Sequence, residues 1–367
     1  MTLGAEVVKV TEQSESDSYD VVVVGGGPAG LSAALTLSRA RRSVLVVDGG
    51  QPRNAPAGHV HNYLGREGIP PGELLAIGRR EVEGYGGRVV PGDVAGAEPT
   101  DGPDIGFVVR LAEGMSVLGR RLLVTTGLVD ELPDVPGVVE RWGRDVLHCP
   151  YCHGWEVRDQ PIGVLATVPA GVYQALLFRQ WSADVTLFLH TAPPLTAEQV
   201  EQLAARDITV VPGEVAGLEV TDDELTGVRL SSGRVVARRA VVVAPLFSAR
   251  ASLLARLSME PAQLQVGGFV MGTRIEADPS GATSVRGVHV AGNVADLHAQ
   301  VLTSAAAGLA AAAALNADLM AEDTGRAVAA LRAGREHPAG VFSGPSEQEV
   351  CDRVLGERRH GLSQVRA

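Results

Sequence analysis

The chain has 367 residues, 45% of them hydrophobic and 20% charged, which is typical of a soluble globular protein long enough for two domains. Its formal net charge of −11 argues against nucleic acid as a partner, because phosphate backbones are bound by clusters of Lys and Arg. Residues 1–20 are polar and lack the apolar segment of a secretory signal, so we expect a cytoplasmic protein. The longest apolar run, residues 305–315, is shorter than the ~20 residues of a membrane span and predicts a buried helix without membrane association.

The first predicted unit is a strand, a glycine turn, a helix and a second strand. Residues 20–25 form an all-apolar run that is typical of a strand buried on both faces, residues 31–40 have a helical pattern, and residues 43–48 form the second strand. Together they predict a βαβ unit of about 30 residues.

The turn in this unit has the spacing of a dinucleotide-binding fingerprint. Gly25 allows the turn, Gly27 lets the backbone approach a pyrophosphate, and Gly30 permits close packing of the helix. The helix N-terminus then faces the phosphates, and Asp48 accepts the ribose hydroxyls. The alternative, a glycine turn with a structural role only, fits this context poorly.

The middle of the chain repeats the pattern at an offset of 141 residues, which places Val21 on Ile162. In the repeat, Ala166 and Val168 replace the first two glycines and Leu189 replaces the acid. The stretch after the second strand also lacks the arginines that hold the 2′-phosphate of NADPH. We interpret this unit as a nicotinamide-type site that has lost its ligand; an NADPH site with unusual contacts is the alternative.

Two of the three cysteines form a CxxC motif, Cys149 and Cys152, between His148 and His153. A cysteine at a helix N-terminus or beside an imidazolium has a lowered pKa, and its thiolate attacks disulfides or passes electrons to a flavin. Zinc is the main rival, but it requires two further ligands at structural spacing, and the sequence has no second CxxC or HxxxH pair. We therefore predict a redox pair and no metal, with either histidine as a base or as a solvated loop residue.

The last predicted elements lead back to the first unit. Strand-like residues 240–244 and 287–291 precede a helix that starts near His298, which suggests that the C-terminal part completes the first domain. From about Ala321 the chain is polar; residues 345–349 have the form of a capping box and predict one short helix. We assign no function to this tail or to Cys351, whose unpaired thiol is more often incidental.

With these residues laid out, residues 19–316 resemble the low-molecular-weight thioredoxin reductase superfamily. The resemblance rests on the Gly25–Gly30 motif, on Thr125-Thr126-Gly127, on the CxxC and on Gly292-Asn293. Residues 148–156 and 53–62 look like the flavin dithiol oxidases, which close disulfides in small natural products of the gliotoxin and holomycin type. Asn293 stands where the reductases usually carry Asp.

The resemblance implies an α/β fold of two Rossmann-like domains, the second inserted in the first, with bound FAD and a homodimer. It places the first part of the FAD-binding domain at 19–130, the inserted domain at 131–245 and the second part at 246–320, between a tail at 1–18 and an extension at 321–367. A helix start at Gln300 would stabilise the charge of the reduced flavin, although core packing alone would also explain this helix. The expected cofactor contacts are Gly25, Gly27, Pro28, Ala29, Gly30, Asp48, Arg53, Asn54, Asn62, Val94, Thr126, Gly127, Gly292, Asn293, Gln300 and Val301.

The resulting hypothesis is a dithiol oxidase. A small-molecule dithiol attacks the Cys149–Cys152 disulfide at Cys149, which family analogy places outward, and Cys152 lies beside the flavin. His148 or His153 takes the thiol protons, and molecular oxygen accepts the electrons and becomes hydrogen peroxide. The rivals are an NADPH-dependent disulfide reductase, a ferredoxin-dependent reductase, and a redox sensor or partner-binding module without turnover.

Overall fold

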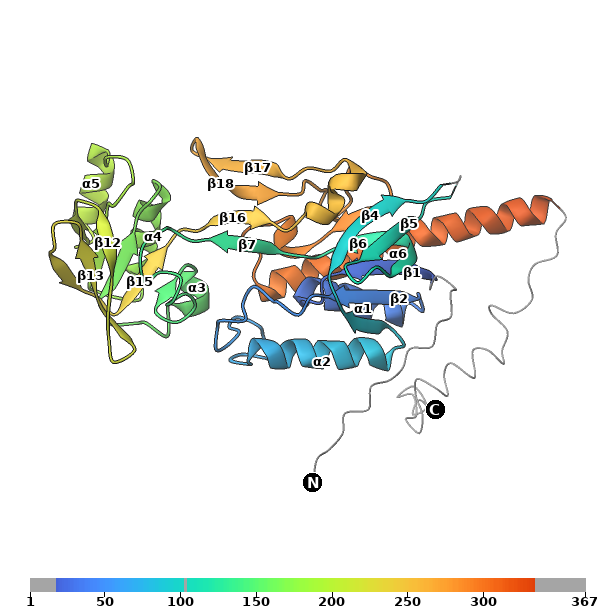
Figure 1. The fold of residues 1–367 in the computed structure, drawn as a ribbon, viewed down its shortest axis with the longest axis horizontal. Coiled ribbons are helices and arrows are strands. Elements are labelled where there is room, and N and C mark those ends of the chain that lie inside the picture. Colours follow the sequence, from blue (N-terminus) through green and yellow to red (C-terminus); the bar gives the residue numbers. More distant parts are fainter. Residues whose placement is uncertain (1–17, 102–103, 334–367) are drawn as a thin grey trace, which may run out of the picture.

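Two α/β units lie end to end along the long axis of the molecule (Figure 1). The computed structural model describes residues 18–101 and 104–333. Residues 345–349 and Cys351 lie outside this described part.

The first unit is built on a seven-stranded mixed sheet with the order β3-β2-β1-β6-β5-β4. The seventh strand, β19, comes from the C-terminal part and pairs in parallel with β6. The chain therefore leaves this sheet and returns to it, which confirms the prediction of one domain inserted in another. The strands are β1 (Ser18–Val24), β2 (Val44–Asp48), β3 (Arg88–Pro91), β4 (Val94–Pro99), β5 (Phe107–Leu111), β6 (Ser116–Val124) and β19 (Val288–Val290).

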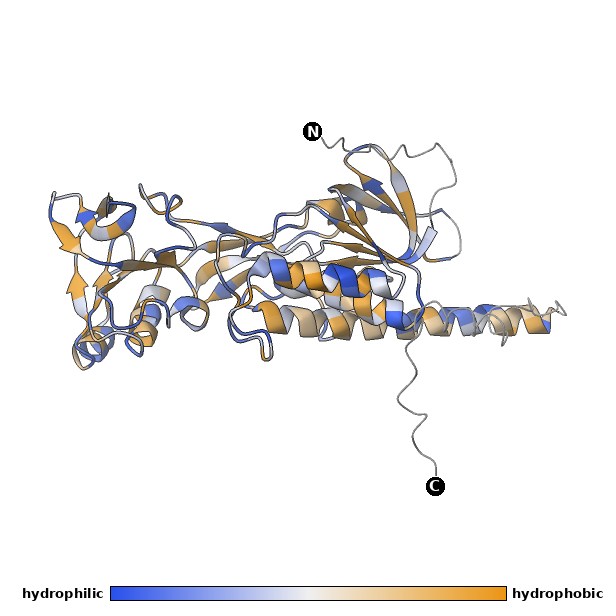
Figure 2. Cartoon of the chain, turned by 90° about the horizontal axis from the view of Figure 1, so that it is seen from below, coloured by the Kyte–Doolittle hydropathy of each residue, from blue (hydrophilic) through white to orange (hydrophobic). Residues whose placement is uncertain are grey.

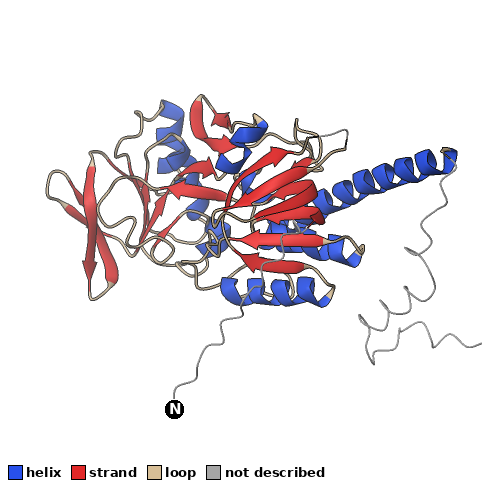
Figure 3. Ribbon diagram, turned by 45° about the vertical axis from the view of Figure 1, so that its right-hand side comes forward, coloured by secondary structure: helices blue, strands red, loops and turns tan. Residues whose placement is uncertain are grey.

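Three helices cover one face of this sheet, α1 (Pro28–Arg39), α2 (Pro71–Gly84) and α6 (Val301–Arg332), as Figure 3 shows in blue against the red strands. Side chains alternate along β1, so Val21 and Val23 pack under the helices while Val22 and Val24 face the opposite cluster. This opposite cluster is closed by β4, β5 and the short 3₁₀ helix η1 (Ser252–Leu257). Burial on both faces explains the unbroken valine run.

The second unit contains a five-stranded parallel sheet, with the order β11-β10-β9-β15-β8. Ile162 pairs with Val185 as Val21 pairs with Val44, so the register is the same in both units at the offset of 141. The bounds are β8 (Val146–Leu147), α3 (Pro150–His153), β9 (Ile162–Leu165), α4 (Ala170–Phe178), β10 (Val185–Phe188), α5 (Ala197–Ala204), β11 (Thr209–Val211) and β15 (Ala240–Val243). An antiparallel sheet of β12 (Val215–Thr221), β13 (Glu224–Leu230) and β14 (Val235–Ala237) covers the far end.

The two chain crossings between the units pair with each other. Strand β7 (Leu128–Glu131) leaves the first unit, β16 (Leu246–Ala249) returns to it, and they are antiparallel partners. The hairpin of β17 (Ala262–Val266) and β18 (Phe269–Arg274) extends this pair to a four-stranded sheet. The link between the units is therefore a hydrogen-bonded ribbon.

Helix α6 continues well past the alanine run, to Arg332, where the sequence predicted only a polar tail. Charged residues anchor the helix as far as Asp323: Asp318 and Glu322 bind the buried guanidinium of Arg121, and Arg120 binds Glu322 and Asp323. By length and composition α6 is apolar enough to cross a membrane. Its inner face packs on α1 and carries these ion pairs.

We expect Arg121→Ala to lower the free energy of unfolding by about 3–5 kcal/mol, because two carboxylates then lose a buried partner. Urea unfolding of the protein measures the loss. The control is Arg229→Ala, which breaks an exposed pair with Glu219 and should cost no more than about 1 kcal/mol. Equal losses in the two variants would contradict a structural role for the Arg121 network.

Candidate functional site

A cavity of about 780 Å³ lies where the two units meet, within the size range of small-molecule and cofactor sites. It is lined by the carboxyl ends of β1 and β2, the loop after β2, α3, β16 and the segment before α6. All four predicted catalytic residues line this cavity, and so do all the predicted cofactor contacts except Gly30 and Asn62.

The glycine turn forms one end of the cavity. Gly25 has a φ of +107°, and a Cβ on Gly30 would lie 1.9 Å from the carbonyl oxygen of Gly25, so neither position accepts a side chain without rearrangement. Gly27 faces open space and is the N-cap of α1, and no side chain caps this helix. Its first N–H groups are therefore left for an anion, which fits the pyrophosphate of FAD.

Asp48 lies beside this turn at the end of β2. Burial alone would raise the pKa of its carboxyl. Hydrogen bonds from Arg79 at 2.6 Å and from the N–H groups of Gly50 and Gly26 outweigh this effect, so the pKa lies below its usual value. The group is thus held as a carboxylate, the form that accepts hydrogen bonds from ribose hydroxyls.

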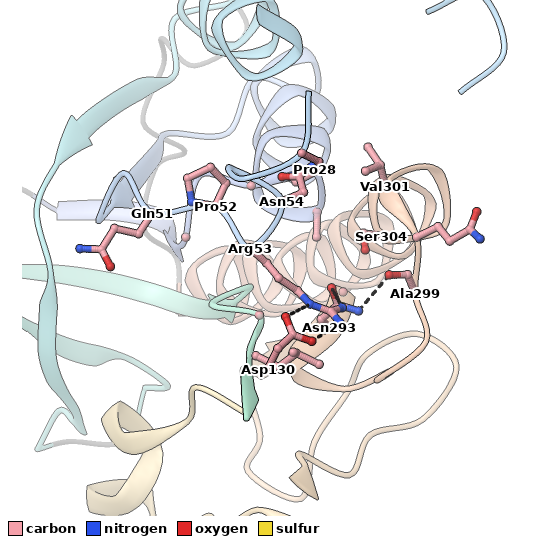
Figure 4. Close-up of a pocket in the computed structure, with 18 of the residues that line it drawn as sticks. Pro28, Gln51, Pro52, Arg53, Asn54, Asp130, Asn293, Ala299, Val301 and Ser304 are labelled. Atoms are coloured by element: carbon pink, nitrogen blue, oxygen red, sulfur yellow. Dashed lines mark hydrogen bonds and ion pairs between the residues drawn. The ribbon is translucent and has the colours of Figure 1, made fainter. Parts of the chain in front are cut away.

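Arg53 is fixed at the centre of the cavity wall (Figure 4). Its guanidinium makes a bidentate pair with the nearly buried Asp130, with distances of 2.7 and 2.6 Å, and lies 5.1 Å from the ring centre of Phe247. It also donates to Oδ1 of Asn293 at 3.3 Å. A permanent cation therefore faces the redox site.

The amide of Asn293 makes contacts on both sides. Its Nδ2 donates to the carbonyl oxygens of Asp296 at 3.0 Å and Ala299 at 2.9 Å, while its Oδ1 accepts from Arg53. A carboxylate has no hydrogen to offer these carbonyls. The amide thus holds the segment that leads into α6.

The cysteine pair sits at the start of α3, with Cys149 as the N-cap, and both residues are free thiols. The side chain of Cys152 donates a hydrogen bond to Cys149, and together with the N–H groups of Cys152 and Tyr151 and the charge of Arg53 it lowers the pKa of Cys149 to about 7. The same bond raises the pKa of Cys152 well above its usual range. Cys149 is therefore the thiol of the reduced pair that ionises first, and its thiol and thiolate forms are both populated near pH 7.

Gln300 also contacts the pair, because its Nε2 lies 3.9 Å from Sγ of Cys149. Gln300 caps the N-terminus of α6, and its backbone N–H donates to Oγ1 of Thr303. The first turn of the long helix and the thiolate are therefore neighbours.

Both predicted histidines are held neutral. Burial lowers the pKa of His148 and of His153. The Nδ1 atom of His148 lies 3.0 Å from the carbonyl oxygen of Val243, which makes Nδ1 the donor and leaves Nε2 as the acceptor. Neutral imidazoles are the form that accepts a proton from a thiol.

The loop after β2 is tied to α3 by the residues around Asn62. Asn62 has a φ of +61° and its Nδ2 donates to the carbonyl oxygen of Tyr151 at 2.7 Å. Nδ1 of His61 lies 2.6 Å from Oε1 of Glu67, and Nε2 of the same ring lies 3.4 Å from Oε1 of Glu156. Asn62 thus holds the redox helix in this structure, and its contact with FAD stays a prediction.

Sequence reasoning did not find several residues that line the cavity. Asp130 and Phe247 lie on the two crossing strands, and His298 packs its ring against Phe247 at 6.0 Å. Trp142 and Tyr173 come from the inserted unit. None belongs to a motif; the only signal was that Asp130 and Phe247 flank the predicted insertion.

The altered fingerprint of the second unit surrounds a separate cavity of about 220 Å³. Ala166, Val168 and Leu189 line it together with prolines, aliphatic side chains and Phe269 of β18. Thr196 and Gln199 are its polar residues, and each already bonds the other across the start of α5. The lining contains no Lys or Arg, so nothing in it matches the phosphates of NADPH.

Comparison with known proteins places this site among flavin enzymes. Residues 19–317 match the family model described as pyridine nucleotide-disulphide oxidoreductase. Thioredoxin reductase tcpT of Claviceps purpurea is 33% identical over 293 residues, which cover 76% of this chain and 88% of that protein.

Two solved structures share the fold. The crystal structure of HlmI is 49% identical with a TM-score of 0.80, covering 86% of this chain and 97% of the other. An oxidoreductase from Agrobacterium tumefaciens is 34% identical with a TM-score of 0.76, covering 83% and 99%.

We expect the alkylation rate of Cys149 in the reduced protein to rise as the pH passes about 7, because the thiolate is the reactive form. Iodoacetamide labelling from pH 5 to 10, with peptide mass spectrometry, measures this profile. Cys152→Ala removes the main hydrogen bond to the thiolate and should move the profile to higher pH. An unchanged profile in this variant would show that Cys152 does not stabilise the thiolate.

Proposed function

The chain belongs to the pyridine nucleotide-disulphide oxidoreductase family and is an FAD-binding oxidoreductase that acts on sulfur groups; we propose that it oxidises a small-molecule dithiol to a cyclic disulfide, with molecular oxygen as electron acceptor. We further propose that it works as a homodimer in the cytoplasm. The domain limits expected from the sequence belong to the same proposal.

One contrast between the two βαβ units carries the proposal. The first keeps an open glycine turn and a carboxylate, while the second has Val168 and Leu189 around an apolar cavity without a cation. A nicotinamide cofactor thus lacks the contacts it needs, whereas the cysteine pair faces a cavity of the size of a cofactor site. Electrons should therefore enter through a dithiol.

The cysteines carry out the thiol chemistry. A substrate thiolate attacks Sγ of Cys149 in the Cys149–Cys152 disulfide, a mixed disulfide forms, and Cys152 leaves as a thiolate. The second substrate thiolate then attacks the substrate sulfur that is bonded to Cys149. This closes the cyclic disulfide and releases Cys149 as a thiolate. Bound FAD supplies the acceptor that takes two electrons from the reduced pair and restores its disulfide. Overall, dithiol and O₂ become cyclic disulfide and H₂O₂.

The surrounding side chains prepare these steps. Arg53 and the backbone N–H groups of α3 stabilise the negative charge on Cys149 when it is released. Nε2 of neutral His148, or the ring of His153, accepts the proton of a substrate thiol. Neutral histidines and a cationic arginine thus divide two tasks: accepting protons and stabilising the thiolate.

The second candidate is an NADPH-dependent disulfide reductase. It is favoured by the intact β9–α4–β10 unit and by the relatives that are described as thioredoxin reductases. In such an enzyme electrons would flow from NADPH through the flavin to the cysteines and on to a substrate disulfide.

Under anaerobic conditions we expect a small dithiol, but not NADPH, to bleach the visible flavin band. Admission of air should restore the band and release about one H₂O₂ for each dithiol oxidised, as the stoichiometry above requires. A stopped-flow spectrophotometer and a peroxide assay measure both. Rapid bleaching by NADPH alone would establish the reductase instead.

We expect Cys149→Ser and Cys152→Ser to lower the turnover of a dithiol at least about 1,000-fold while the flavin absorbance is retained, because a serine cannot form the disulfide. Cys351→Ser, which removes the third cysteine, is the matched control and should keep full turnover. Near-normal oxidation by either Cys149→Ser or Cys152→Ser would exclude the cysteine pair from the reaction.

A further inference from the structure

One buried polar side chain beside the site has no part in the steps described above. Gln174 lies on α4 with 7% of its surface exposed, among Val172, Ala175 and Phe178 of the core of the inserted unit. Hydrophobic residues run through this unit and are orange in Figure 2. A buried amide costs free energy unless it is hydrogen-bonded, and Oε1 of Gln174 has no partner among the described residues. Packing alone therefore does not account for a glutamine here.

The other end of this amide lies at His148, one of the two candidate bases. Nε2 of Gln174 is 3.3 Å from Nδ1 of His148 and 3.3 Å from the carbonyl oxygen of Val243, and Nδ1 itself is 3.0 Å from that oxygen. A carbonyl oxygen has two lone pairs, so it accepts from both nitrogens. If Nδ1 carried no hydrogen, its lone pair would face the carbonyl oxygen at this short distance. The hydrogen is therefore on Nδ1, and Nε2 of His148 keeps its lone pair.

The imidazole of His148 also packs on Phe247. The two ring centres are 5.3 Å apart and the rings are inclined by 80°, which is an edge-to-face contact. Three elements thus fix the ring: α4 through Gln174, the end of β15 through Val243, and β16 through Phe247. His148 lines the redox cavity, whereas Gln174 does not. Gln174 can therefore act on a substrate only through His148.

His153, the other candidate base, lacks such support. Among the described residues no hydrogen bond reaches its ring nitrogens, and its neighbours Glu156 and His61 act on its pKa in opposite directions. No contact thus fixes one of its two tautomers. His148 is the ring that is prepared to accept a proton at one defined atom.

We infer that Gln174 is a positioning residue that holds His148 as the base of the thiol exchange, an inference that rests on the function proposed above. The proton of the first substrate thiol passes to Nε2 of His148, and the electron pair of the broken S–H bond stays on the sulfur that attacks Cys149. The proton later leaves with the electrons that convert O₂ to H₂O₂.

The inference gives α4 a function other than dinucleotide binding. The loop before α4 carries Val168 in place of a glycine and borders the apolar cavity. Tyr173 and Leu177 of α4 line the redox cavity, and Gln174 between them reaches His148. The βαβ core of the inserted unit thus serves as a support for acid–base chemistry.

Replacement of the amide tests the inference. Gln174→Met keeps the length of the side chain but cannot donate to Val243, so His148 is held less firmly. In anaerobic stopped flow, saturating dithiothreitol should bleach the flavin band at least about 10-fold more slowly than in the unaltered chain, at an unchanged half-saturating concentration, because a placed base contributes about 10²–10⁴-fold. Gln180→Met makes the same change at an exposed position just after α4 and should keep the full rate. Equal rates in these two variants would contradict the inference.

A second substitution at each histidine identifies the ring through which Gln174 acts. Adding Gln174→Met to His148→Ala should lower the rate no further, whereas adding it to His153→Ala should again lower the rate about 10-fold. Losses of the same size in both backgrounds would show that Gln174 has a structural role only.

The resting protein provides a measurement that needs no substrate. In ¹⁵N NMR of the histidine-labelled protein, the signal of His148 is assigned by its loss in His148→Ala. It should show a hydrogen on Nδ1 that exchanges with water at least about 10-fold faster in Gln174→Met than in Gln180→Met, because part of its support is lost. A hydrogen on Nε2 of His148, or equal exchange in both variants, would overturn the inference. A flavin that no dithiol bleaches would overturn the proposed function instead, and the NMR signal would still report on the contact between Gln174 and His148.

Discussion

The contact on which the site depends is the one between Arg53, Asp130 and Phe247. Asp130 and Phe247 are direct cross-strand partners on β7 and β16, the two chain crossings, and Arg53 binds the carboxylate of the first and lies over the ring of the second. Because Arg53 also bonds Asn293, one guanidinium joins the loop after β2, both crossings and the segment before α6. The position of the inserted unit, the charge facing the cysteines and the start of α6 therefore share a single anchor.

The sequence predicts features that depend on residues close together in the chain. It does not predict features that depend on contacts between distant segments. The βαβ units were predictable because a strand buried on both faces is apolar throughout, and because the repeat offset preserves even the strand register. The redox pair was predictable for the same reason, because its motif lies within one short segment. Asp130 was not found, because its partner Arg53 lies 77 residues away and only its place next to the predicted insertion marks it.

The second half of α6 also depends on residues that are distant in the chain. From about Ala321 we predicted a polar tail without strong periodicity, with one short helix at residues 345–349. Helix α6 persists because Glu322 and Asp323 find arginines on β6, about 200 residues earlier in the chain. This run thus gains partners that only the folded sheet supplies, and nothing in its own segment indicates them.

The charges around the cysteine pair fit together only as a set. Burial keeps His148 and His153 neutral, so they add no second positive charge near Arg53. Were either imidazole permanently protonated, the thiolate of Cys149 would be stabilised further, but the ring could no longer accept a proton from an arriving thiol. Burial also acts to raise the pKa of Cys149. The hydrogen bond from Cys152 and the N–H groups of α3 outweigh this effect and lower the pKa. One cavity thus holds a sulfur that ionises near neutral pH beside neutral bases, which is the combination that thiol exchange at this pH requires.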